Sequence, residues 1–575
     1  MKNIIYLYFL MLMVVFGSCQ KLDRELQTDL TQEQIAGSFV NVQNLMNGVY
    51  AELREGFLEI DGEAMMASTT DEAEHTDETN TVQAFNQGSW NAASNPADVW
   101  GPTFRAVRRA NFFLETADPA KINLDAFKTD LPTLALRLSE INRWRYEARF
   151  LRAFFYFELV KRYGGVPLFT KTLTEQDIAS TQRNSLEQCI KFISDECDSA
   201  AAVLPLTYAT GELGRATKGA ALSLKSRVLL YAASDLFNTP SWAGGYAKPE
   251  LISLPAGDRM LRWVAAADAA KAVIDLTGTG YALATNYKAL FTTFNSPEII
   301  FTRRNAASNT FEIANFPIGF DKGKSGTTPT QDLVDAYEIK VNATTAVPFD
   351  WNNPAHSANP YAATGATARD PRLFANVVAN ASSFSTVAGQ TRNVQIWEGG
   401  LDGKPIPNAT KTGYYLRKYV NESVNIVNNT TAVHSWIYFR MAEIYLNYAE
   451  ALNEYAPGSA DIKINVDRVR TRTGVAMPGM PAGTQAEVRQ RIRNERRIEL
   501  AFEDHRAWDV RRWMIAPATL GASVRGVRVI QTSPGVFTYT PQTVEPRIFQ
   551  PKMYLFPILQ VELSVASGLV QNPLW

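Results

Sequence analysis

Several tryptophans of this chain combine an aromatic face with nearby hydrogen-bonding side chains. They lie in or beside turn-rich stretches that contain Asn, Asp or Gly: Trp90, Trp100, Trp242, Trp351 and Trp397. Sugar rings present apolar C–H faces that stack on aromatic planes, while sugar hydroxyls need amide or carboxylate partners. These residue types therefore predict a glycan-binding surface. The alternative for each tryptophan is that its ring fills a local core.

Three of these tryptophans are the strongest candidates because they lie in irregular segments and have hydrogen-bonding neighbours. The predicted ligand contacts are Trp90, Asn91, Trp351, Asn352, Trp397 and Glu398. All of them interrupt helical patterns, and a helical solenoid does not need them to close. We therefore expect the loop around Trp90 and the region around Trp351 and Trp397 to form one binding face.

No catalytic or metal-binding constellation stands out in the sequence. The four histidines are scattered, and neither a nucleophile elbow nor a phosphate-binding loop is present. The acidic residues Asp71, Glu72, Glu74, Asp77 and Glu78 lack the regular spacing of a calcium loop, so we interpret them as a solvated acidic loop. We predict no catalytic residue, no metal and no cofactor. A glycoside hydrolase remains a remote alternative, because its two carboxylates need to be close only in space.

An arginine-rich segment near the C-terminus has the pattern of a structural helix. The spacing predicts ion pairs three residues apart, such as Arg496–Glu499 and Glu503–Arg506. The other face carries a core-facing stripe: Ile498, Ala501, Phe502, His505 and Trp508. We therefore interpret residues 487–514 as one salt-bridged helix rather than as a site for a polyanion.

The N-terminus has the pattern of an export signal. Lys2 precedes an apolar stretch, and the small residues Gly17 and Ser18 precede Cys19. This ending resembles a bacterial lipobox, which predicts a signal peptide over residues 1–18 and acylation of Cys19. Residues 19–35 are polar and lack periodicity, which favours a flexible tether. The alternative is an ordinary signal peptide with an incidental cysteine.

Composition indicates a large folded body behind this leader. The chain has 575 residues, of which 46% are hydrophobic and 20% charged, and its net charge is −1. This balance offers no electrostatic case for nucleic acid. Apart from Cys19, the only cysteines are Cys189 and Cys197. Their spacing in a helical pattern is too wide for a disulfide, so we expect both to be small core residues.

Hydrophobic periodicity predicts a mainly α fold. The expected helices cover residues 41–54, 99–116, 143–163, 186–204, 217–237, 262–276, 441–455, 461–471 and 487–514. Paired helices with alanines at close-contact positions suggest a tetratricopeptide-like helical solenoid. Residues 281–435 are rich in Asn, Thr, Gly and Pro, with short strand-like pieces at 299–301, 394–397 and 414–419. We interpret them as an irregular, loop-rich subdomain that packs with the solenoid.

Motifs along nearly the full length resemble those of the SusD/RagB nutrient-binding lipoproteins of Bacteroidetes. They comprise the lipobox ending at Cys19 and residues 44–53, 109–114, 147–167, 440–453, 495–513 and 554–573. The resemblance implies a SusD-like helical part over 36–280, the irregular subdomain over 281–435 and a SusD/RagB-like helical part over 436–575.

This resemblance also carries expectations about function. It implies a lipid-anchored protein of the cell outer membrane that faces the medium, captures glycans and delivers them to a SusC-like TonB-dependent transporter. Peptides or glycopeptides are the alternative ligands of the same scaffold. No binding motif of the family transfers by residue type, so the candidate contacts depend only on their position in irregular segments.

Overall fold

The computed structural model describes residues 31–320 and 322–575. The predicted signal peptide, Cys19 and most of the predicted tether lie outside the described residues. The last part of the expected tether is helical instead, because α2 (Gln32–Ala36) begins with a capping box and buries Ile35 and Ala36. No helix in the described part of the chain is both long enough and apolar enough to span a membrane.

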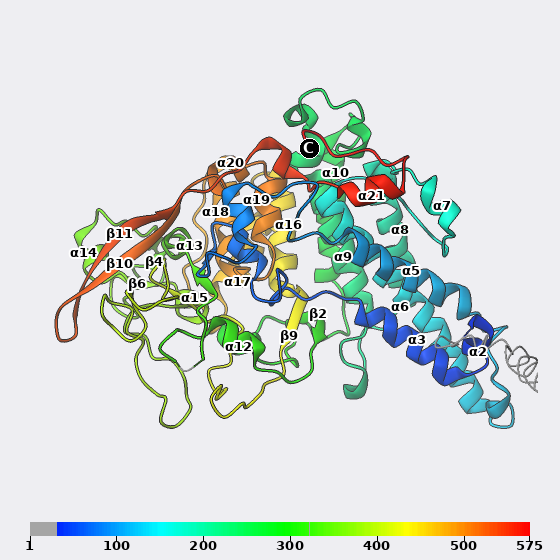
Figure 1. Cartoon of the computed structure of the whole chain (residues 1–575), viewed down its shortest axis with the longest axis horizontal. Helices are drawn as coiled ribbons and strands as arrows, with labels where there is room; N and C mark the ends of the chain where they lie inside the picture. Colours follow the sequence, from blue (N-terminus) through cyan, green and yellow to red (C-terminus); the bar gives the residue numbers. More distant parts are fainter. Residues whose placement is uncertain (1–30, 321) are drawn as a thin grey trace, which may run out of the picture.

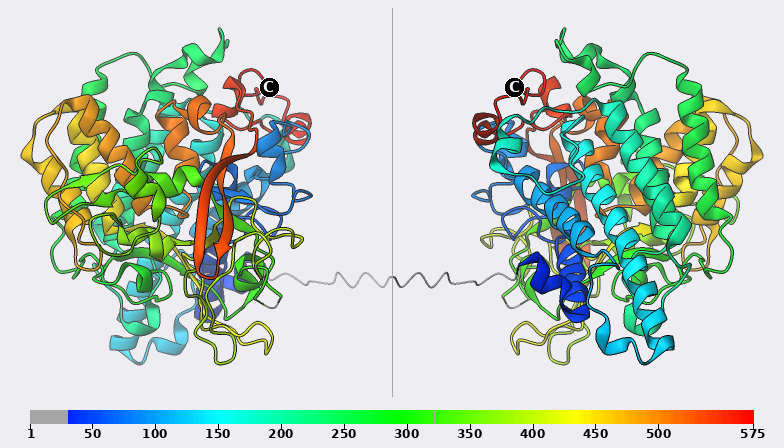
Figure 2. Two further views of the ribbon diagram at one scale, coloured as in Figure 1. Left: turned by 90° about the vertical axis from the view of Figure 1, so that its left-hand side faces the viewer. Right: turned by 90° about the vertical axis from the view of Figure 1, so that its right-hand side faces the viewer.

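Long helices packed side by side form the body of the molecule (Figures 1 and 2). They are α3 (Phe39–Ala51), α5 (Trp100–Thr116), α6 (Leu131–Tyr163), α8 (Leu186–Val203), α9 (Lys218–Ala233), α10 (Arg259–Ile274), α16 (Met441–Tyr455), α17 (Ala460–Thr471) and α18 (Gln485–Glu499). From α5 to α17, each helix in this series packs against the next, and α10 contacts α16 directly. Helices from both ends of the sequence therefore form one row, which confirms the tetratricopeptide-like solenoid.

Small side chains bring the central helices of this row close together. Ala220 and Ala221 on α9 and Ala266, Ala267 and Ala270 on α10 are all buried. Cys189 and Cys197 on α8 are free and buried, which confirms them as core residues. Helix α6 begins well before the predicted residue 143, because Asp130 caps its first turn and Pro132 suits a position where no helical N–H is needed.

Short elements make up the rest of the chain. The shorter helices are α4 (Gln83–Gln87), α7 (Glu175–Ala179), α11 (Tyr287–Leu290), α12 (Thr310–Asn315), α13 (Gln331–Ala336), α14 (Pro354–Ala358), α15 (Pro371–Asn376), α19 (Arg506–Arg512), α20 (Ala516–Thr519) and α21 (Gln560–Val565). Most of the regular structure in residues 281–435 consists of such pieces, and in Figure 1 this region lies beside the helical row as long loops.

Small antiparallel sheets tie the irregular region to both helical parts. The pairs are β1 (Ala73–His75) with β3 (Thr327–Pro329), β2 (Ile299–Arg304) with β9 (Ser435–Arg440), and β7 (Val377–Val378) with β8 (Tyr415–Leu416). A three-stranded sheet joins β4 (Ile339–Lys340) to β5 (Ala346–Val347) and β6 (Ala368–Arg369). The strand predicted at 299–301 is present and that at 414–419 is shorter, but residues 394–397 form no strand.

A long hairpin that we did not predict projects from the C-terminal part. It pairs β10 (Val524–Ser533) with β11 (Val536–Glu545). Figure 1 shows it at the end of the molecule that lies opposite α3 and α6, and it faces the viewer in the left panel of Figure 2. Because β10 also packs on α13, the hairpin is held against the irregular region.

The arginine-rich segment is two helices rather than one. α18 ends at Glu499 and α19 begins at Arg506, and in the break Phe502 and Asp504 have left-handed φ values of 62° and 60°. The predicted ion pairs between neighbours are wrong as well, because these side chains reach partners far away in the sequence. Glu503 binds Arg440, and Arg506 binds Asp71. The core-facing stripe is confirmed, since all of its residues are buried.

Candidate functional site

Trp90 is not available to a ligand, which corrects the prediction for this residue. Its side chain is 2% exposed and its ring lies 4.9 Å from Phe85, 5.1 Å from Phe556 and 4.8 Å from Trp575. The C-terminal segment covers the loop, so the ring fills core between distant parts of the chain. Asn91 is exposed, but its Oδ1 accepts a hydrogen bond from the Ala93 N–H at 2.8 Å and so closes a turn.

Trp351 is half-buried and its indole is held in a fixed orientation. Its Nε1–H donates to Asp335 Oδ1 at 3.0 Å, and its ring meets Phe349 edge to face at 5.1 Å. The neighbouring Asn352 is exposed, with its backbone N–H donating to Asp350 Oδ1 at 2.9 Å. A fixed indole with one part exposed suits stacking, because little conformational freedom is lost when a ring binds to it.

Trp397 belongs to a band of half-buried aromatic rings along the hairpin. Its ring lies 5.1 Å from Phe537, which is 6.5 Å from Tyr539, and Tyr539 is 5.2 Å from Tyr361. Phe537 and Tyr539 are two residues apart on β11 and so point to the same face. We call Trp351, Tyr361, Trp397, Phe537 and Tyr539 the hairpin platform.

Polar side chains connect the members of the hairpin platform. Arg528 on β10 donates from Nε to Glu398 Oε1 at 2.6 Å, and this hydrogen bond lowers the pKa of the exposed Glu398 carboxyl. Arg525 binds Asp332 at 2.6 Å and Asp335 at 3.0 Å, and Asp335 is the carboxylate that holds Trp351. The structure thus brings Trp351 and Trp397 to the same hairpin through ion pairs and places Trp90 elsewhere.

The sequence interpretation missed Tyr361, Phe537 and Tyr539. A signal for the two hairpin residues was present, because Phe537 and Tyr539 alternate with polar threonines and Pro534-Gly535 precede the strand. Tyr361 carries no such signal. Only the folded chain places it 5.2 Å from Tyr539, across more than a hundred residues of sequence.

The predicted solvated acidic loop is largely buried. Asp71, Glu72 and Glu74 are at most 8% exposed, and only Asp77 and Glu78 reach solvent. Burial tends to raise the pKa of Asp71, but Arg497 and Arg506 hold it well below its usual value. Burial raises the pKa of Glu72 to about 8. Within residues 31–320 and 322–575, no group of three or more His, Cys, Asp or Glu side chains could hold a metal ion.

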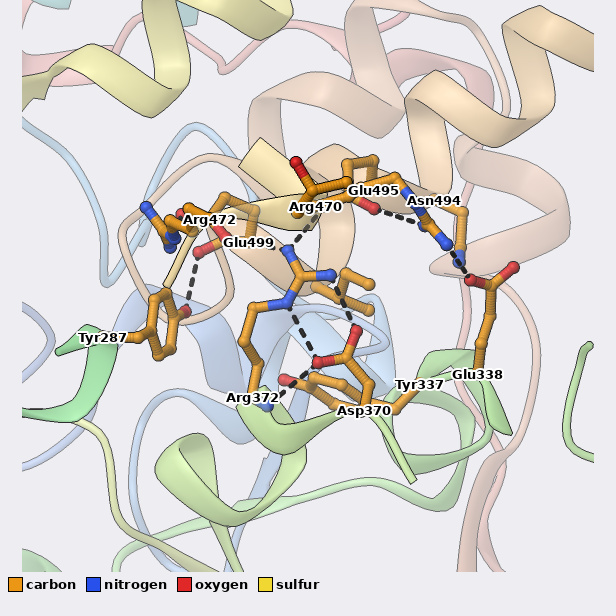
Figure 3. A network of polar contacts seen from close by, with 12 residues as sticks. Tyr287, Tyr337, Glu338, Asp370, Arg372, Arg470, Arg472, Asn494, Glu495 and Glu499 are labelled. Atoms are coloured by element: carbon orange, nitrogen blue, oxygen red, sulfur yellow. Dashed lines mark hydrogen bonds and ion pairs between the residues drawn. The ribbon is translucent and has the colours of Figure 1, made fainter. Parts of the chain in front are cut away.

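A cluster of polar and charged side chains is buried between the irregular region, α17 and α18 (Figure 3). Arg372 on α15 contacts Asp370 at 2.7 Å, Glu495 at 2.5 Å and Glu499 at 2.8 Å, and all four side chains are 0% exposed. The cluster, which we call the buried charge network, also includes Glu298, Lys418, Arg440, Arg470, Arg472 and Glu503.

The charges of this network are matched to one another. Burial tends to raise the pKa of Glu503, but Arg440 and Lys418 lower it below its usual value. For the cation Lys418 burial acts in the other direction and lowers its pKa to about 8, although the nearby Glu503 tends to raise it. Because these groups are buried and paired, the network joins the irregular region to β9, α17 and α18, and its charged groups are occupied by one another.

Comparison with known proteins identifies the scaffold. Residues 297–575 match the model of the SusD family, and residues 20–230 match a family described as "Starch-binding associating with outer membrane". The chain is 22% identical to SusD-like protein P25 of Formosa agariphila, over 89% of this chain and 90% of that protein.

Solved structures agree with these matches. A SusD-like protein of Bacteroides fragilis has a TM-score of 0.77 and 29% identity, covering 94% of this chain and 98% of that one. A SusD-like carbohydrate-binding protein of the same species has a TM-score of 0.73 and 25% identity, covering 93% of this chain and 100% of that one. With both halves matched in sequence and nearly the whole fold matched in space, this chain belongs to the SusD/RagB family.

Proposed function

We propose that this protein captures glycans at the hairpin platform and delivers them to a SusC-like TonB-dependent transporter of the outer membrane. One observation carries the proposal: five half-buried aromatic side chains lie at one hairpin, and the exposed Glu398 and Asn352 each follow one of the tryptophans. The aromatic rings can stack on the apolar faces of sugars, and the carboxylate and amide groups can bind sugar hydroxyls.

The comparisons support this assignment. One matching family is described as starch-binding and as associating with the outer membrane, and a structural neighbour is described as carbohydrate-binding. The predicted acylation of Cys19 would supply the membrane attachment. Stable attachment by lipid requires more than one acyl chain, so we expect Cys19 to carry several.

Titration calorimetry tests the ligand class. Maltoheptaose, laminarihexaose, polygalacturonic acid and a set of defined octapeptides are titrated into the full-length protein, and the solutions are then analysed for cleavage products. We expect heat from at least one saccharide, no heat from the peptides and no products. Binding of peptides alone would favour the peptide alternative, and shortened saccharides would indicate a glycoside hydrolase.

Fractionation tests the anchor. Because acylation requires the thiol of Cys19, the Cys19→Ala protein should leave the membrane fraction, whereas the wild type stays there in high salt. The matched control is Cys189→Ala, whose thiol is buried in α8, and it should remain with the membrane. Retention of Cys19→Ala in a strain that lacks the transporter would contradict the lipid anchor.

Affinity purification tests the partner. The wild-type protein, solubilised from outer membranes in mild detergent, should bring down a large TonB-dependent transporter. The Trp397→Ala variant should do so equally well, because the hairpin platform is assigned to the glycan. Loss of the transporter with Trp397→Ala would place this surface at the protein interface instead.

A further inference from the structure

A concave surface lies between the solenoid and β2, away from the hairpin. It is a groove of about 370 Å³ formed by the loops that follow α8 and α10 and by residues 294–304, which include β2. In Figure 1, β2 lies near the middle of the molecule, whereas β10 and β11 project at one end. The groove and the hairpin platform share no residue.

Four aromatic side chains line the groove. Phe301 is buried in the core, and two of the other three are held rigidly. Tyr281 lies so close to α9 that a Cβ atom on Gly219 would be 2.2 Å from its hydroxyl oxygen, so a larger residue there would displace the ring. The Tyr208 hydroxyl donates to Glu147 Oε1 at 3.0 Å. Rings fixed in this way lose little freedom when a ligand stacks on them.

The third aromatic side chain is more open and carries a cation. Phe294 is 39% exposed, and the Arg304 guanidinium lies 3.8 Å from the centre of its ring. In the described part of the chain, Arg304 has no carboxylate partner, and the side chains of Asn295 and Thr207 have no hydrogen-bond partner. The groove therefore combines aromatic surface with unpaired guanidinium, amide and hydroxyl groups.

Two glycines keep the backbone of the groove bare. Gly214 and Gly280 both line it with left-handed φ values of 95° and 71°. A Cβ atom on Gly280 would meet nothing within 4 Å, so the space beside it is open. Side chains are absent where a ring could lie against the backbone, which is a common use of glycine near ligands.

We propose that this groove is a second glycan-binding subsite, separate from the hairpin platform. Tyr281 and Phe294 stack on the apolar faces of a pyranose unit, while Arg304 and Asn295 donate hydrogen bonds to its hydroxyls. The ligand class rests on the proposed function, but the location does not, because different residues form the two sites. Two sites on one molecule hold a long glycan chain more tightly than either site alone.

Titration of single-site variants tests the proposal. Maltoheptaose, laminarihexaose and polygalacturonic acid are titrated into the wild-type protein and into Phe294→Ala, Trp397→Ala and the double variant. We expect two sites in the wild type. In each single variant, affinity should fall at least about tenfold at the altered site and stay unchanged at the other, and in the double variant both sites should be weakened.

Phe294 is preferred to Tyr281 because its partial exposure makes unfolding on substitution improbable. The matched control is Leu261→Ala, which removes an exposed apolar side chain on α10, and it should bind like the wild type. Unchanged stoichiometry and affinity in Phe294→Ala would overturn the second subsite and leave the proposed function intact. If only Trp397→Ala has no effect, the groove stands and the hairpin platform is wrong. If the wild type binds no saccharide, both are overturned.

Discussion

Residues 281–435 contribute to two clusters that differ in burial: the buried charge network and the hairpin platform. Arg372 belongs to the buried charge network and its side chain is 0% exposed, whereas Trp397 belongs to the hairpin platform and is half-buried. A buried charge cannot be satisfied by water, so it needs partners fixed by the fold. A half-buried aromatic ring needs no charged partner, and its exposed part is accessible to a ligand.

Accessibility therefore separates a structural cluster from a candidate binding site. The arginines and carboxylates of the network bind one another at 2.5–3.1 Å. The platform offers less polar chemistry but more accessible surface. Substitutions in the two regions should therefore separate stability from binding.

The largest expected effect comes from breaking the network. Arg372→Met retains the bulk of the side chain but leaves Asp370, Glu495 and Glu499 without their shared cation. We expect the free energy of unfolding to fall by about 3–5 kcal/mol, because Asp370 is left buried without a cation, whereas Glu495 and Glu499 keep other arginine partners. Chemical denaturation measures the change.

A matched control separates burial from charge. Lys191→Met breaks an ion pair with Asp195 on the exposed surface of α8, and it should leave the denaturation curve almost unchanged. If Arg372→Met unfolds like the wild type but no longer binds glycan, the network is part of the ligand site. The separation of a structural network from a binding platform would then be wrong.

The next effect distinguishes the two kinds of tryptophan. Trp90→Ala removes a ring packed on Phe85, Phe556 and Trp575, and we expect it to cost about 3–5 kcal/mol of stability, as for other buried tryptophans. Thermal unfolding monitored by circular dichroism measures this. A Trp90→Ala protein that melts normally would show that the C-terminal segment does not depend on this ring.

Trp397→Ala should show the reverse pattern. The ring lies at the surface of the hairpin, so its loss should change the melting temperature little while weakening glycan binding by about 2 kcal/mol, or roughly thirtyfold. Calorimetry with the saccharide that binds the wild type measures the affinity. A folded variant that binds normally would remove Trp397 from the platform.

The smallest effect concerns how pH acts on the base of the hairpin. Burial and the neighbouring Glu74 raise the pKa of Glu545, the last residue of β11, to about 7. The native state therefore holds the proton of Glu545 more tightly than the unfolded state. Its contribution to the free energy of unfolding is fully present below the unfolded pKa and is lost as the pH rises through 7. Wild-type stability should therefore fall between pH 5 and pH 8.

The Glu545→Gln variant should not lose stability in this way, because glutamine stays neutral at every pH. At pH 8 its melting temperature should exceed that of the wild type by roughly 1–2 °C, the shift that about 1 kcal/mol produces in a large protein. At pH 5 the two proteins should melt alike. The control is Glu78→Gln, because Glu78 is exposed and, like Glu545, pairs with Lys411. Its stability should follow the wild-type pH curve. A pH-independent difference would mean that Glu545 acts through packing instead.

Local sequence patterns determined much of the fold. Apolar residues three and four apart predicted the long helices of both halves, including Met441–Tyr455, and alanine positions predicted the close packing of α9 and α10. Helical periodicity can be recognised from local sequence because each helix must bury one apolar face, whichever elements cover it. Turn-rich composition likewise marked residues 281–435, where the structure has mostly short elements.

Long-range partners decided the rest. The sequence shows that Trp90 and Trp397 both have polar neighbours, but the folded chain packs Trp575 against Trp90 and Phe537 against Trp397. In the same way, the sequence determined that residues 489–512 are rich in arginine and acid. Tertiary structure decided that Arg506 binds Asp71 instead of Glu503. The physical reason is that burial depends on what else covers a side chain, and those atoms come from segments hundreds of residues away.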